Sequence, residues 1–579
     1  MACTSLFCFL SVFADNALTQ TVSNITARTT HESAENNLLL DTDSINLQNI
    51  ELNTPFQLDV KLLSDGLPVA SANIDWQISQ TITSSRQGAY FVINAGQFPT
   101  LTTQPTDANG SSVITINTGE YSSVYSITAS ASISLVGGGL VTLSQTFVVN
   151  AGIESSVKSN TPEKSIASTL DTMCPKLEEN ENELNQQQQA LLDRCNAIQL
   201  AVSEGKTVEV SNVLRQISPE EVAVQSDIGT RFSAQQISNV ASRLQAVRRG
   251  TSQLSFNNFA FRYGGQAIPM SYLLNSLVSG DEEKSMETGA LKNNRLGIFA
   301  SGNVSIGDRA TTDKEDGFEF DSYGVTAGAD YRVNANRFIG AAVGFSKSEV
   351  MIADEHGEMD ATGISLSLYI NQYIDRHWYV DGVINIGNNK FDMQRNINFD
   401  LTGSSVNRTA TSSTNGSQQG VSFTTGYEMQ DGALSAIIFG SLNYTKLGID
   451  SFTETGAQEL NLRIDKQTID TTSTSVNAQI QYTHSSRRGV FIPFVGFGWV
   501  HEFDNSADSI SGAFSSDEFD SEFDISTEQS DSNYFTNSQG ITAIFPRGVS
   551  AYIKIENIIG KEFYKTTNVS FGGRMELQF

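Results

Sequence analysis

The last residues of the chain, 568–579, alternate between apolar and polar side chains. The apolar row comprises Val569, Phe571, Met575, Leu577 and Phe579, with Gly573 as its one small member. A period of two places the two rows on opposite faces of one extended strand. The sequence therefore predicts a terminal strand that is apolar on one face, polar on the other, and ends on an aromatic residue.

The same alternation recurs along the preceding part of the chain. The segments that carry it begin near Leu296, Tyr323, Phe338, Ile364, Trp378, Val421, Leu434, Val476, Phe491, Tyr534 and Val549. With the terminal segment they give about twelve strands, an even number, as closure of an antiparallel bacterial barrel requires.

Short and long connections alternate between these segments. Short turns are expected at 334–336, 375–377, 430–432, 485–489 and 546–548, and long polar connections at 308–322, 351–360, 396–417, 451–471 and 504–533. Outer-membrane barrels have short periplasmic turns and longer outer loops, whereas a soluble β-sandwich, the alternative, gives no reason for the alternation. We therefore predict a mainly β chain in which residues 291–579 form a transmembrane, antiparallel β-barrel.

The composition of the 579 residues agrees with that fold class. The sequence has no run of about 20 apolar residues, so no membrane-spanning helix is expected. Its mean hydropathy of −0.20 suits a barrel. A net charge of −28 disfavours nucleic acid as a partner, which would require basic patches, and is consistent with solubility. The length predicts more than one domain.

The first residues, 1–14, are expected to be a signal peptide. They hold a short apolar core, and Ala14 offers a small-residue cleavage position. No Lys or Arg precedes the core, and the alternative is a buried apolar strand. Cleavage would remove Cys3 and Cys8 and leave Cys174 and Cys195 in the exported chain.

Residues 45–150 contain short alternating runs that are rich in Val, Ile, Thr and Ser and separated by turn signals. Short strands at this spacing over about a hundred residues predict a β-sandwich. The segment resembles the bacterial Ig-like domains of the invasin and intimin type. The resemblance depends on two patterns. Residues 65–69 are followed by a strand that contains Trp76. The turn 106–110 lies before a strand, and residues 125–129 come after that strand.

Residues 160–290 are predicted to be a helical stalk or linker. Leucine and isoleucine recur at sevens from Leu177, and Ser233 with Gln236 is expected to open a further helix. In an oxidising compartment Cys174 and Cys195 would pair. On one continuous helix they would be about 30 Å apart, so a disulfide requires a break, which 180–185 supplies. Two free thiols are the alternative.

A signal, an N-terminal segment and a C-terminal barrel that ends in Phe together resemble the autotransporter family. The resemblance implies that the barrel inserts with help from the barrel-assembly machinery, which would recognise Gly573, Met575, Leu577 and Phe579. It also implies that an N-terminal passenger passes through the pore and that a helix within 233–294 remains as a plug. Outer-membrane lipid, lipopolysaccharide and periplasmic chaperones are the other expected partners. Acidic stretches at 313–316 and 517–524 are expected to be solvated loop faces.

An enzymatic passenger is not expected, and neither is a cofactor or a metal. Between Ala14 and the barrel the only histidine is His31, whereas triad and zinc chemistry need positioned imidazoles or several ligands. The expected function is therefore display of a short passenger on the surface of a Gram-negative bacterium, for adhesion to an unknown ligand. The alternatives are a barrel anchor or pore with periplasmic N-terminal domains, and an exported hydrolase that uses a carboxylate pair.

Overall fold

The computed structural model describes seventeen stretches of the chain and divides it into two compact units, Met1–Gly152 and Ile153–Phe579. The described residues are 29–33, 36–41, 50–64, 67–80, 87–94, 96–134, 140–157, 161–251, 260–263, 266–269, 296–334, 336–352, 356–401, 403–503, 509–529, 531–545 and 549–577. The expected signal peptide with Ala14, and the terminal Phe579, lie outside them.

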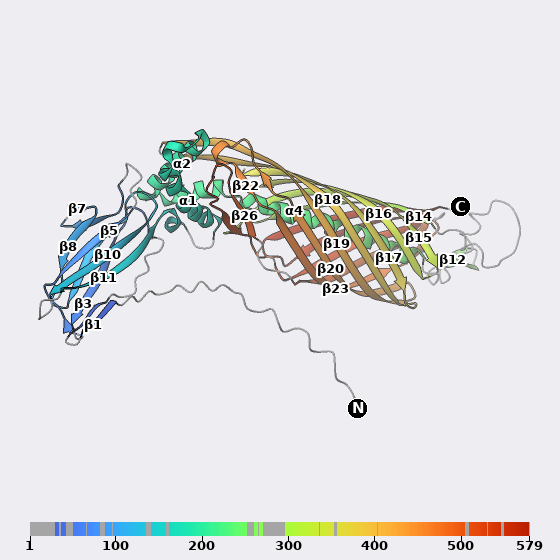
Figure 1. Ribbon diagram of the computed structural model, residues 1–579. Coiled ribbons are helices and arrows are strands. Elements are labelled where there is room, and N and C mark those ends of the chain that lie inside the picture. Colours follow the sequence, from blue (N-terminus) through green and yellow to red (C-terminus); the bar gives the residue numbers. More distant parts are fainter. Residues whose placement is uncertain are drawn as a thin grey trace, which may run out of the picture. The chain divides into compact units, whose positions relative to one another are not determined.

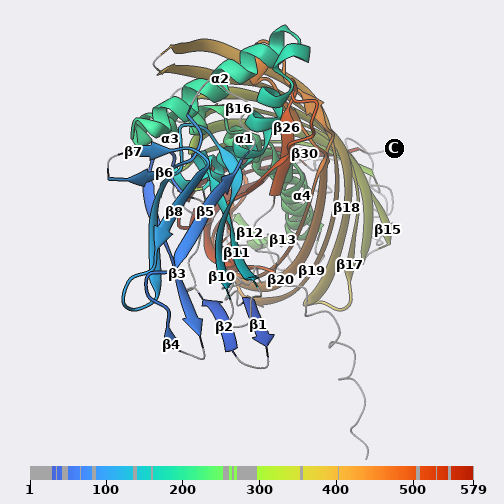
Figure 2. The same ribbon diagram turned by 60° about the vertical axis from the view of Figure 1, so that its left-hand side comes forward.

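The first unit contains two antiparallel β-sheets (Figure 2). One has the order β1 (Thr29–Ser33), β2 (Asn36–Asp41), β3 (Pro55–Ser64), β9 (Ser111–Asn117), β6 (Tyr90–Ile93) and β7 (Gly96–Phe98), with β4 (Leu67–Pro68) paired to β3. The other has the order β11 (Leu140–Ala151), β10 (Ser123–Ser134), β5 (Asn73–Ser79) and β8 (Leu101–Pro105).

The core of this unit lies between the two sheets. Alternate residues of β3, β5 and β10 are buried, as a period of two requires when one face of each sheet is covered. Trp76 of β5 is fully buried, and its Nε1 donates a hydrogen bond to Ser112 Oγ of β9 at 3.3 Å. The strands expected at 74–78 and 125–129 lie within β5 and β10. The described strands begin at Thr29, upstream of the expected boundary at 45.

The second unit begins with helices. They are η1 (Ile153–Ser156), α1 (Pro162–Glu179), η2 (Glu181–Glu183), α2 (Gln186–Ser203), α3 (Thr207–Ile217), η3 (Glu220–Val222) and α4 (Ala223–Thr251). The expected break at 180–185 is present, and Asn185 starts α2 with a capping box that includes Gln188. Cys174 of α1 and Cys195 of α2 form a disulfide.

Two expectations for 160–290 were wrong. Ser233 does not open a helix, because α4 already begins at Ala223 and passes through Ser233 without a break. The segment is also not helical throughout, because β12 (Ala260–Tyr263) and β13 (Gln266–Pro269) form a hairpin. Ser233 is fully buried inside the helix.

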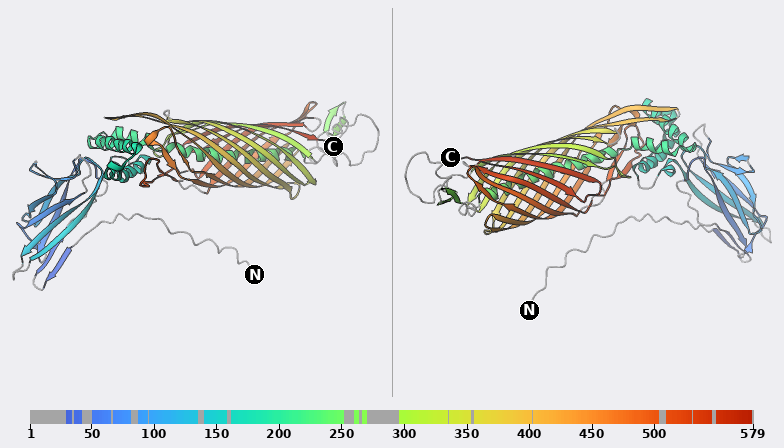
Figure 3. Two further views of the ribbon diagram at one scale, coloured as in Figure 1. Left: turned by 45° about the horizontal axis from the view of Figure 1, so that its top comes forward. Right: turned by 180° about the vertical axis from the view of Figure 1, so that it is seen from behind.

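The barrel wall has twelve strands, each paired with its neighbours in sequence. They are β14 (Leu296–Arg309), β15 (Phe318–Asn334), β16 (Arg337–Ile352), β17 (Gly357–Tyr373), β18 (Trp378–Leu401), β19 (Ser404–Asp431), β20 (Leu434–Ile449), β23 (Gln467–Tyr482) with its extension β24 (His484–Ser486), β25 (Gly489–Glu502), β28 (Asn533–Phe545), β29 (Val549–Ile559) and β30 (Tyr564–Leu577). Pairing of β14 with β30 closes the ring, so the expected mainly β fold with a C-terminal twelve-stranded barrel is confirmed (Figure 3).

The long connections at one end of the barrel are folded. They contain β21 (Phe452–Thr453), β22 (Leu462–Ile464), β26 (Ser509–Phe514) and β27 (Phe523–Ser526), which form a small sheet, and η5 (Gln458–Leu460). The expected long loop at 396–417 was wrong, because β18 continues to Leu401 and β19 starts at Ser404. Among the described residues, no helix is long and apolar enough to cross a membrane.

Candidate functional site

Helix α4 lies inside the barrel, along the lumen (Figures 1 and 3). It contacts seven successive strands of the wall, from β14 to β20. Ile237, Val240 and Leu244 of the helix are buried in one cluster with Phe299 of β14 and Tyr369 of β17. The helix predicted within 233–294 as a plug is therefore present in part, but it starts ten residues earlier than expected.

Gln236 and Asn239 connect the helix to the wall by hydrogen bonds. The Gln236 amide donates to Ser367 Oγ at 3.2 Å and accepts from Thr326 Oγ1 at 2.7 Å. Asn239 Nδ2 donates to Thr326 Oγ1 at 3.0 Å and to Asn303 Oδ1 at 3.2 Å. Polar side chains of the lumen that would need water in an open pore are thus satisfied by the helix.

An ion pair joins the next turn of the helix to the wall. Arg243 Nε donates to Asp330 Oδ2 at 2.9 Å, and the two side chains are 3% and 2% exposed. Arg574 Nη2 of β30 lies 3.8 Å from Asp330 Oδ1, and Arg243 also lies 5.0 Å from the centre of the Phe299 ring. A buried pair of this kind is costly to break, because the remaining charge has no solvent.

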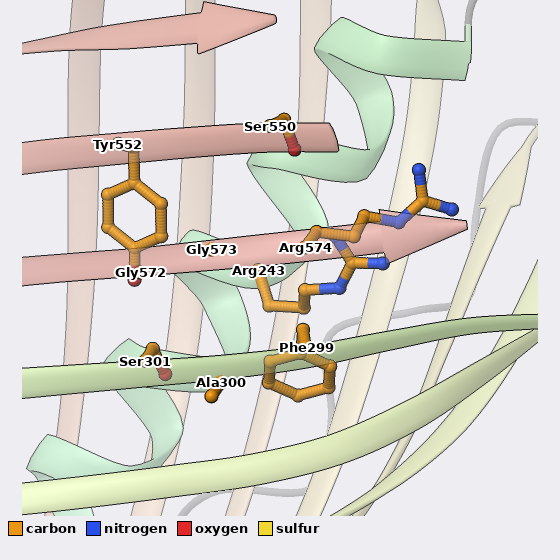
Figure 4. A pocket seen from close by; sticks show the side chains of 9 residues that line it. All are labelled: Arg243, Phe299, Ala300, Ser301, Ser550, Tyr552, Gly572, Gly573 and Arg574. Carbon is orange, nitrogen blue, oxygen red and sulfur yellow. The ribbon is translucent and has the colours of Figure 1, made fainter. Parts of the chain in front are cut away.

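Arg243, Phe299 and Arg574 also line a small cavity at the seam where β30 meets β14 (Figure 4). Its volume is ≈ 10 Å³, about the least that holds one water molecule.

Glycines allow the helix to approach the wall closely. A Cβ on Gly344 of β16 would lie 2.2 Å from Gln236 Oε1, and a Cβ on Gly229 of α4 would lie 2.6 Å from Leu447 Cδ2 of β20. A larger residue at either position would force the Gln236 or the Leu447 side chain to move. Near the start of the helix, the Arg231 guanidinium lies 4.3 Å from the centre of the Tyr564 ring, a cation–π contact.

Helices α1 to α3 form a cap on the end of the barrel that carries the long connections. Arg194 of α2 donates to Glu459 Oε1 at 3.0 Å and to Ser404 Oγ at 2.5 Å. Ser165 of α1 donates to the Asp524 carbonyl at 2.7 Å, and its Oγ accepts from the Asp524 amide at 3.1 Å. The helices expected to form a stalk are therefore docked on the barrel's own loops.

Titratable groups collect where the cap meets the loops. Arg215 of α3 donates to Asp316 Oδ1, and His356 Nδ1 lies 2.6 Å from Asp316 Oδ2. Glu220 and Glu221 of η3 are 5% and 2% exposed, and each has a carboxylate oxygen without a hydrogen-bond partner among the described residues. Burial raises the pKa of Glu220 to about 10 and that of Glu221 to about 8.

The expectation of solvated loop faces holds for most of 517–524, where Glu518, Asp520, Glu522 and Asp524 are exposed, and was wrong for part of 313–316. Glu315 and Asp316 are nearly fully buried, and burial raises the pKa of Glu315 to about 7. Asp517 is buried too, and its carboxylate accepts hydrogen bonds from the Phe519 and Ser521 amides. No group of three or more His, Cys, Asp or Glu among the described residues could hold a metal ion.

The residues predicted as an assembly signal lie in β30, except Phe579. Gly573, Met575 and Leu577 pair with Ala300, Ile298 and Leu296 of the first strand. Their role in assembly stays a prediction.

Sequence reasoning missed Arg243 and Asp330. Gln236, Asn239 and Arg243 are spaced by three and four residues, so a polar stripe on one face of the helix could have indicated a polar lumen wall.

Comparison with known proteins identifies the barrel. Residues 298–556 match the family model "Autotransporter beta-domain". Outer membrane protein B of Rickettsia typhi is 26% identical over 229 residues, 38% of this chain and 14% of that protein. Outer membrane protein B of Rickettsia rickettsii is 26% identical over 256 residues, 42% of this chain and 15% of that protein. The match thus spans only a small share of these relatives' own length.

Two solved structures have a similar barrel. The translocator domain of the autotransporter NalP from Neisseria meningitidis is 16% identical with a TM-score of 0.40, and the match covers 49% of this chain and 89% of that one. The β-domain of the Bordetella autotransporter Brka is 14% identical with a TM-score of 0.37, over 49% and 100% of the two chains.

A domain of this family lies in the outer membrane and interacts with that membrane and with its barrel-assembly machinery. The twelve-stranded barrel of this chain is an autotransporter β-domain, which places the protein in the outer membrane of a Gram-negative bacterium.

Proposed function

We propose that the barrel translocates the chain's own N-terminal segment to the cell surface, where the segment remains displayed and acts in adhesion. One observation carries the first part: α4 runs through the lumen from the end of β14, where Asp227 pairs with Arg309, toward the start of β14, where Arg243 pairs with Asp330 opposite Gly297. Long connections face outward in outer-membrane barrels. The chain upstream of α4 therefore emerges on the outside.

The direction of α4 also argues against the periplasmic alternative. If the N-terminal sheets stayed in the periplasm, the chain would have to approach α4 from the end where β14 pairs with β30 at Leu296 and Leu577. Instead, η1 and α1 contact each other and the loops at the other end. Among the described residues, no observation favours a barrel that acts as an anchor or pore with periplasmic N-terminal domains.

Adhesion is the less direct part of the proposal. It is supported by the two β-sheets of residues 29–151, a form suited to binding by an exposed surface, and by the resemblance of residues 45–150 to Ig-like domains of invasins. We propose no catalytic role for this segment, because residues 29–151 contain a single histidine, His31, and no cysteine. Lipopolysaccharide around the barrel and periplasmic chaperones before insertion are further proposed partners.

Protease accessibility on intact cells tests display. An epitope tag between Ala108 and Asn109, two exposed residues of a turn, is expected to be lost to external protease while a periplasmic marker survives. Survival of the tag until the outer membrane is broken would overturn display.

Adhesion is tested with the same tagged cells. They are expected to bind host cells or matrix better than vector controls do, and to lose that binding when protease removes the tag. Cells that display the tag but bind no better than the controls would leave translocation intact and reject adhesion.

A further inference from the structure

The outward side chains of β16, β17 and β18 form rows that cross the three strands in register. Val343, Leu366 and Ile386 are directly opposite one another and are 56%, 43% and 53% exposed. Exposed apolar side chains at alternate positions face lipid in an outer-membrane barrel. This row therefore lies at the level of the hydrocarbon.

The lipid-facing band ends within two further rows toward the long connections. The first of these rows contains Phe345, Ile364 and Asn388, and the second contains Lys347, Thr362 and Lys390. Successive rows are about 7 Å apart along the strands. Tyr323 of β15 lies opposite Lys347 and is 44% exposed, and aromatic residues of this kind mark the boundary of the band. Two lysines and a hydroxyl thus lie where hydrocarbon gives way to the outer aqueous layer.

We call Lys347, Thr362 and Lys390 the lysine row. Because Thr362 lies between the two lysines, their Cα atoms are separated by two strand spacings, about 10 Å. Lysine carries its charge on a flexible four-carbon stem, so both ammonium groups can approach one phosphate above Thr362. Lysine binds phosphate as a point charge, and the row therefore suits a phosphate group.

The next row outward is acidic and contains Glu349, Asp360 and Asp392. Lys347 Nζ donates to Glu349 Oε1 at 2.6 Å, and Lys390 Nζ donates to Asp392 Oδ2 at 2.7 Å. An ammonium group has three donors, so each lysine keeps a donor for a phosphate that approaches from the lipid side. The carboxylates lie farther from the hydrocarbon than the lysines do.

Two other outward lysines near the end of the band have a different setting. Lys446 of β20 is directly opposite Asp470 of β23, and Lys565 of β30 is directly opposite Asp308 of β14. An opposite charge in the same row compensates each of these lysines. Within the lysine row there is no such carboxylate, and the residue opposite Lys390 on β19 is Asn415.

Beyond these charged rows, β18 and β19 continue outward with exposed amides and hydroxyls. They include Gln394, Asn396, Asn398, Asn407, Thr409 and Thr411. Thr409 Oγ1, for example, donates to Asn396 Oδ1 at 3.0 Å. Carboxamides and hydroxyls both donate and accept hydrogen bonds, as the hydroxyls of a sugar do. From the hydrocarbon outward, this face presents apolar side chains, then ammonium and carboxylate groups, then mainly uncharged polar groups.

We propose that this face binds a phosphorylated glycolipid of the outer leaflet, lipopolysaccharide. Its acyl chains lie on the apolar rows, a headgroup phosphate on the lysine row, and its sugars along the outward side of β18 and β19. A phospholipid matches the first two levels but has no sugar chain for the third. The inference deepens the lipopolysaccharide partnership proposed above and rests on the outward orientation of the long connections, but not on adhesion.

Binding of purified rough lipopolysaccharide to the full chain in detergent, measured by native mass spectrometry, tests the proposal. The double variant Lys347→Gln with Lys390→Gln is expected to bind at least tenfold more weakly than the unmodified chain. Lys347→Arg with Lys390→Arg is expected to retain binding, because the charges remain. The matched control, Lys446→Gln with Lys565→Gln, removes the same number of charges and is expected to bind within twofold of the unmodified chain.

Heat-modifiable gel migration shows that each variant is folded. Undiminished binding by the Lys347→Gln, Lys390→Gln variant would overturn the proposal, and so would an equal loss in the matched control, which would indicate a general effect of charge.

The lipid itself supplies a second comparison. Enzymatically dephosphorylated lipopolysaccharide is expected to bind the unmodified chain at least tenfold more weakly than the intact lipid. Equal binding of the two lipids would overturn the assignment of the phosphate. Equal binding of phosphatidylglycerol and lipopolysaccharide would overturn the choice of a glycolipid and assign the lysine row to phospholipid. Display is measured separately on intact cells, so a failure of one proposal is distinguishable from a failure of the other.

Discussion

At the scale of single residues, the junction between cap and loops depends on protonation. Burial raises the pKa of Glu221 to about 8, against an opposing effect of Arg395. A carboxyl whose pKa is higher in the folded than in the unfolded chain costs stability as pH rises between the two values. The hydrogen bond that His356 donates to Asp316 raises the pKa of His356, so the stability of that pair is also lost as pH rises. The Glu221 effect weakens the junction as pH rises from about 4.5 to about 8, and the His356 effect weakens it as pH rises above 6.5.

We therefore expect the cap to loosen in alkali. Amide hydrogen exchange of α3, corrected for intrinsic rates, should show protection falling at least tenfold from pH 6 to pH 9, about 1.4 kcal/mol. Glu221→Gln should remove the part of that change that Glu221 causes, because its side chain stays neutral throughout, while the rest belongs to Glu220, whose pKa burial raises to about 10. Glu209→Gln, on the exposed side of α3, is the control and should behave like the unmodified chain. An unchanged pH dependence in Glu221→Gln would contradict this explanation.

The burial of Glu315 and Asp316 could not be predicted from the sequence, because it depends on partners that are distant in the chain. Asp316 is neutralised by Arg215, which lies 101 residues away in the chain. Glu315 pairs with Arg309 and accepts from the Glu528 amide, 213 residues away. A run of charges is usually solvated, so only the fold reveals that this one is enclosed.

At the scale of elements, β18 changes its two faces along its length. Near its start, Ile384 and Ile386 face outward and Asn385 faces inward. Beyond Gly387 the outward residues are polar, such as Asn388, while Phe391 is fully buried on the inner face. The alternation is therefore kept along the whole strand, but its apolar residues face outward to lipid in the first part and inward in the later part.

Matched substitutions in β18 test this change. Ile384→Lys should cost about 2–4 kcal/mol of membrane stability and reduce the amount of folded barrel. Phe391→Lys should leave insertion intact and make the cap and the start of α4 more accessible to protease, because Phe391 lies beside Gly229 of α4. Folded barrel is measured by heat-modifiable migration and cap docking by limited proteolysis. Equal loss of barrel in both variants would contradict the assignment of the two faces.

The disulfide is an element-scale constraint on the cap. Cys174 and Cys195 are fully buried and close a loop with a separation of 21 residues, for which the chain-entropy estimate is about 3 kcal/mol. Replacing both by alanine should make α1 and α2 exchange amide hydrogens faster, with the barrel unaffected. The isotopic pattern of β14 to β17 is the internal control. Unchanged exchange in α1 would mean that docking alone holds the cap.

Elements with a strong period could be predicted from the sequence. Alternation located the twelve strands, because each of them separates lipid from a polar lumen. The loop at 396–417 was misjudged because Ile397, Phe399 and Val406 pack under the cap, and no local signal reveals a second apolar environment. The start of α4 was missed because Ser233 with Gln236 suggested a helix start, whereas packing in the lumen makes 223–251 continuous.

At the scale of the whole molecule, α4 connects the cap to the barrel and also fills the lumen. It is the only described segment that joins the cap to the first strand's side of the barrel, and its polar contacts with the wall replace the water that would fill an empty lumen. A pore wide enough to pass a chain must be closed afterwards, since outer-membrane integrity depends on it. In the Arg243–Asp330 pair, which joins α4 to the wall, both groups are almost entirely buried.

Removing one partner of that pair should open the pore. Asp330→Ala leaves Arg243 buried beside Arg574 without its carboxylate, a cost of about 3–5 kcal/mol, and should release the helix part of the time. In planar bilayers the unmodified chain should conduct little and the variant should open frequently. The control is Arg243→Leu with Asp330→Leu, which removes both charges and should remain mostly closed, since replacing a whole buried pair by apolar groups is close to neutral. If the single variant stays as closed as the unmodified chain, the hydrogen bonds of Gln236 and Asn239, rather than the ion pair, hold the helix in the lumen.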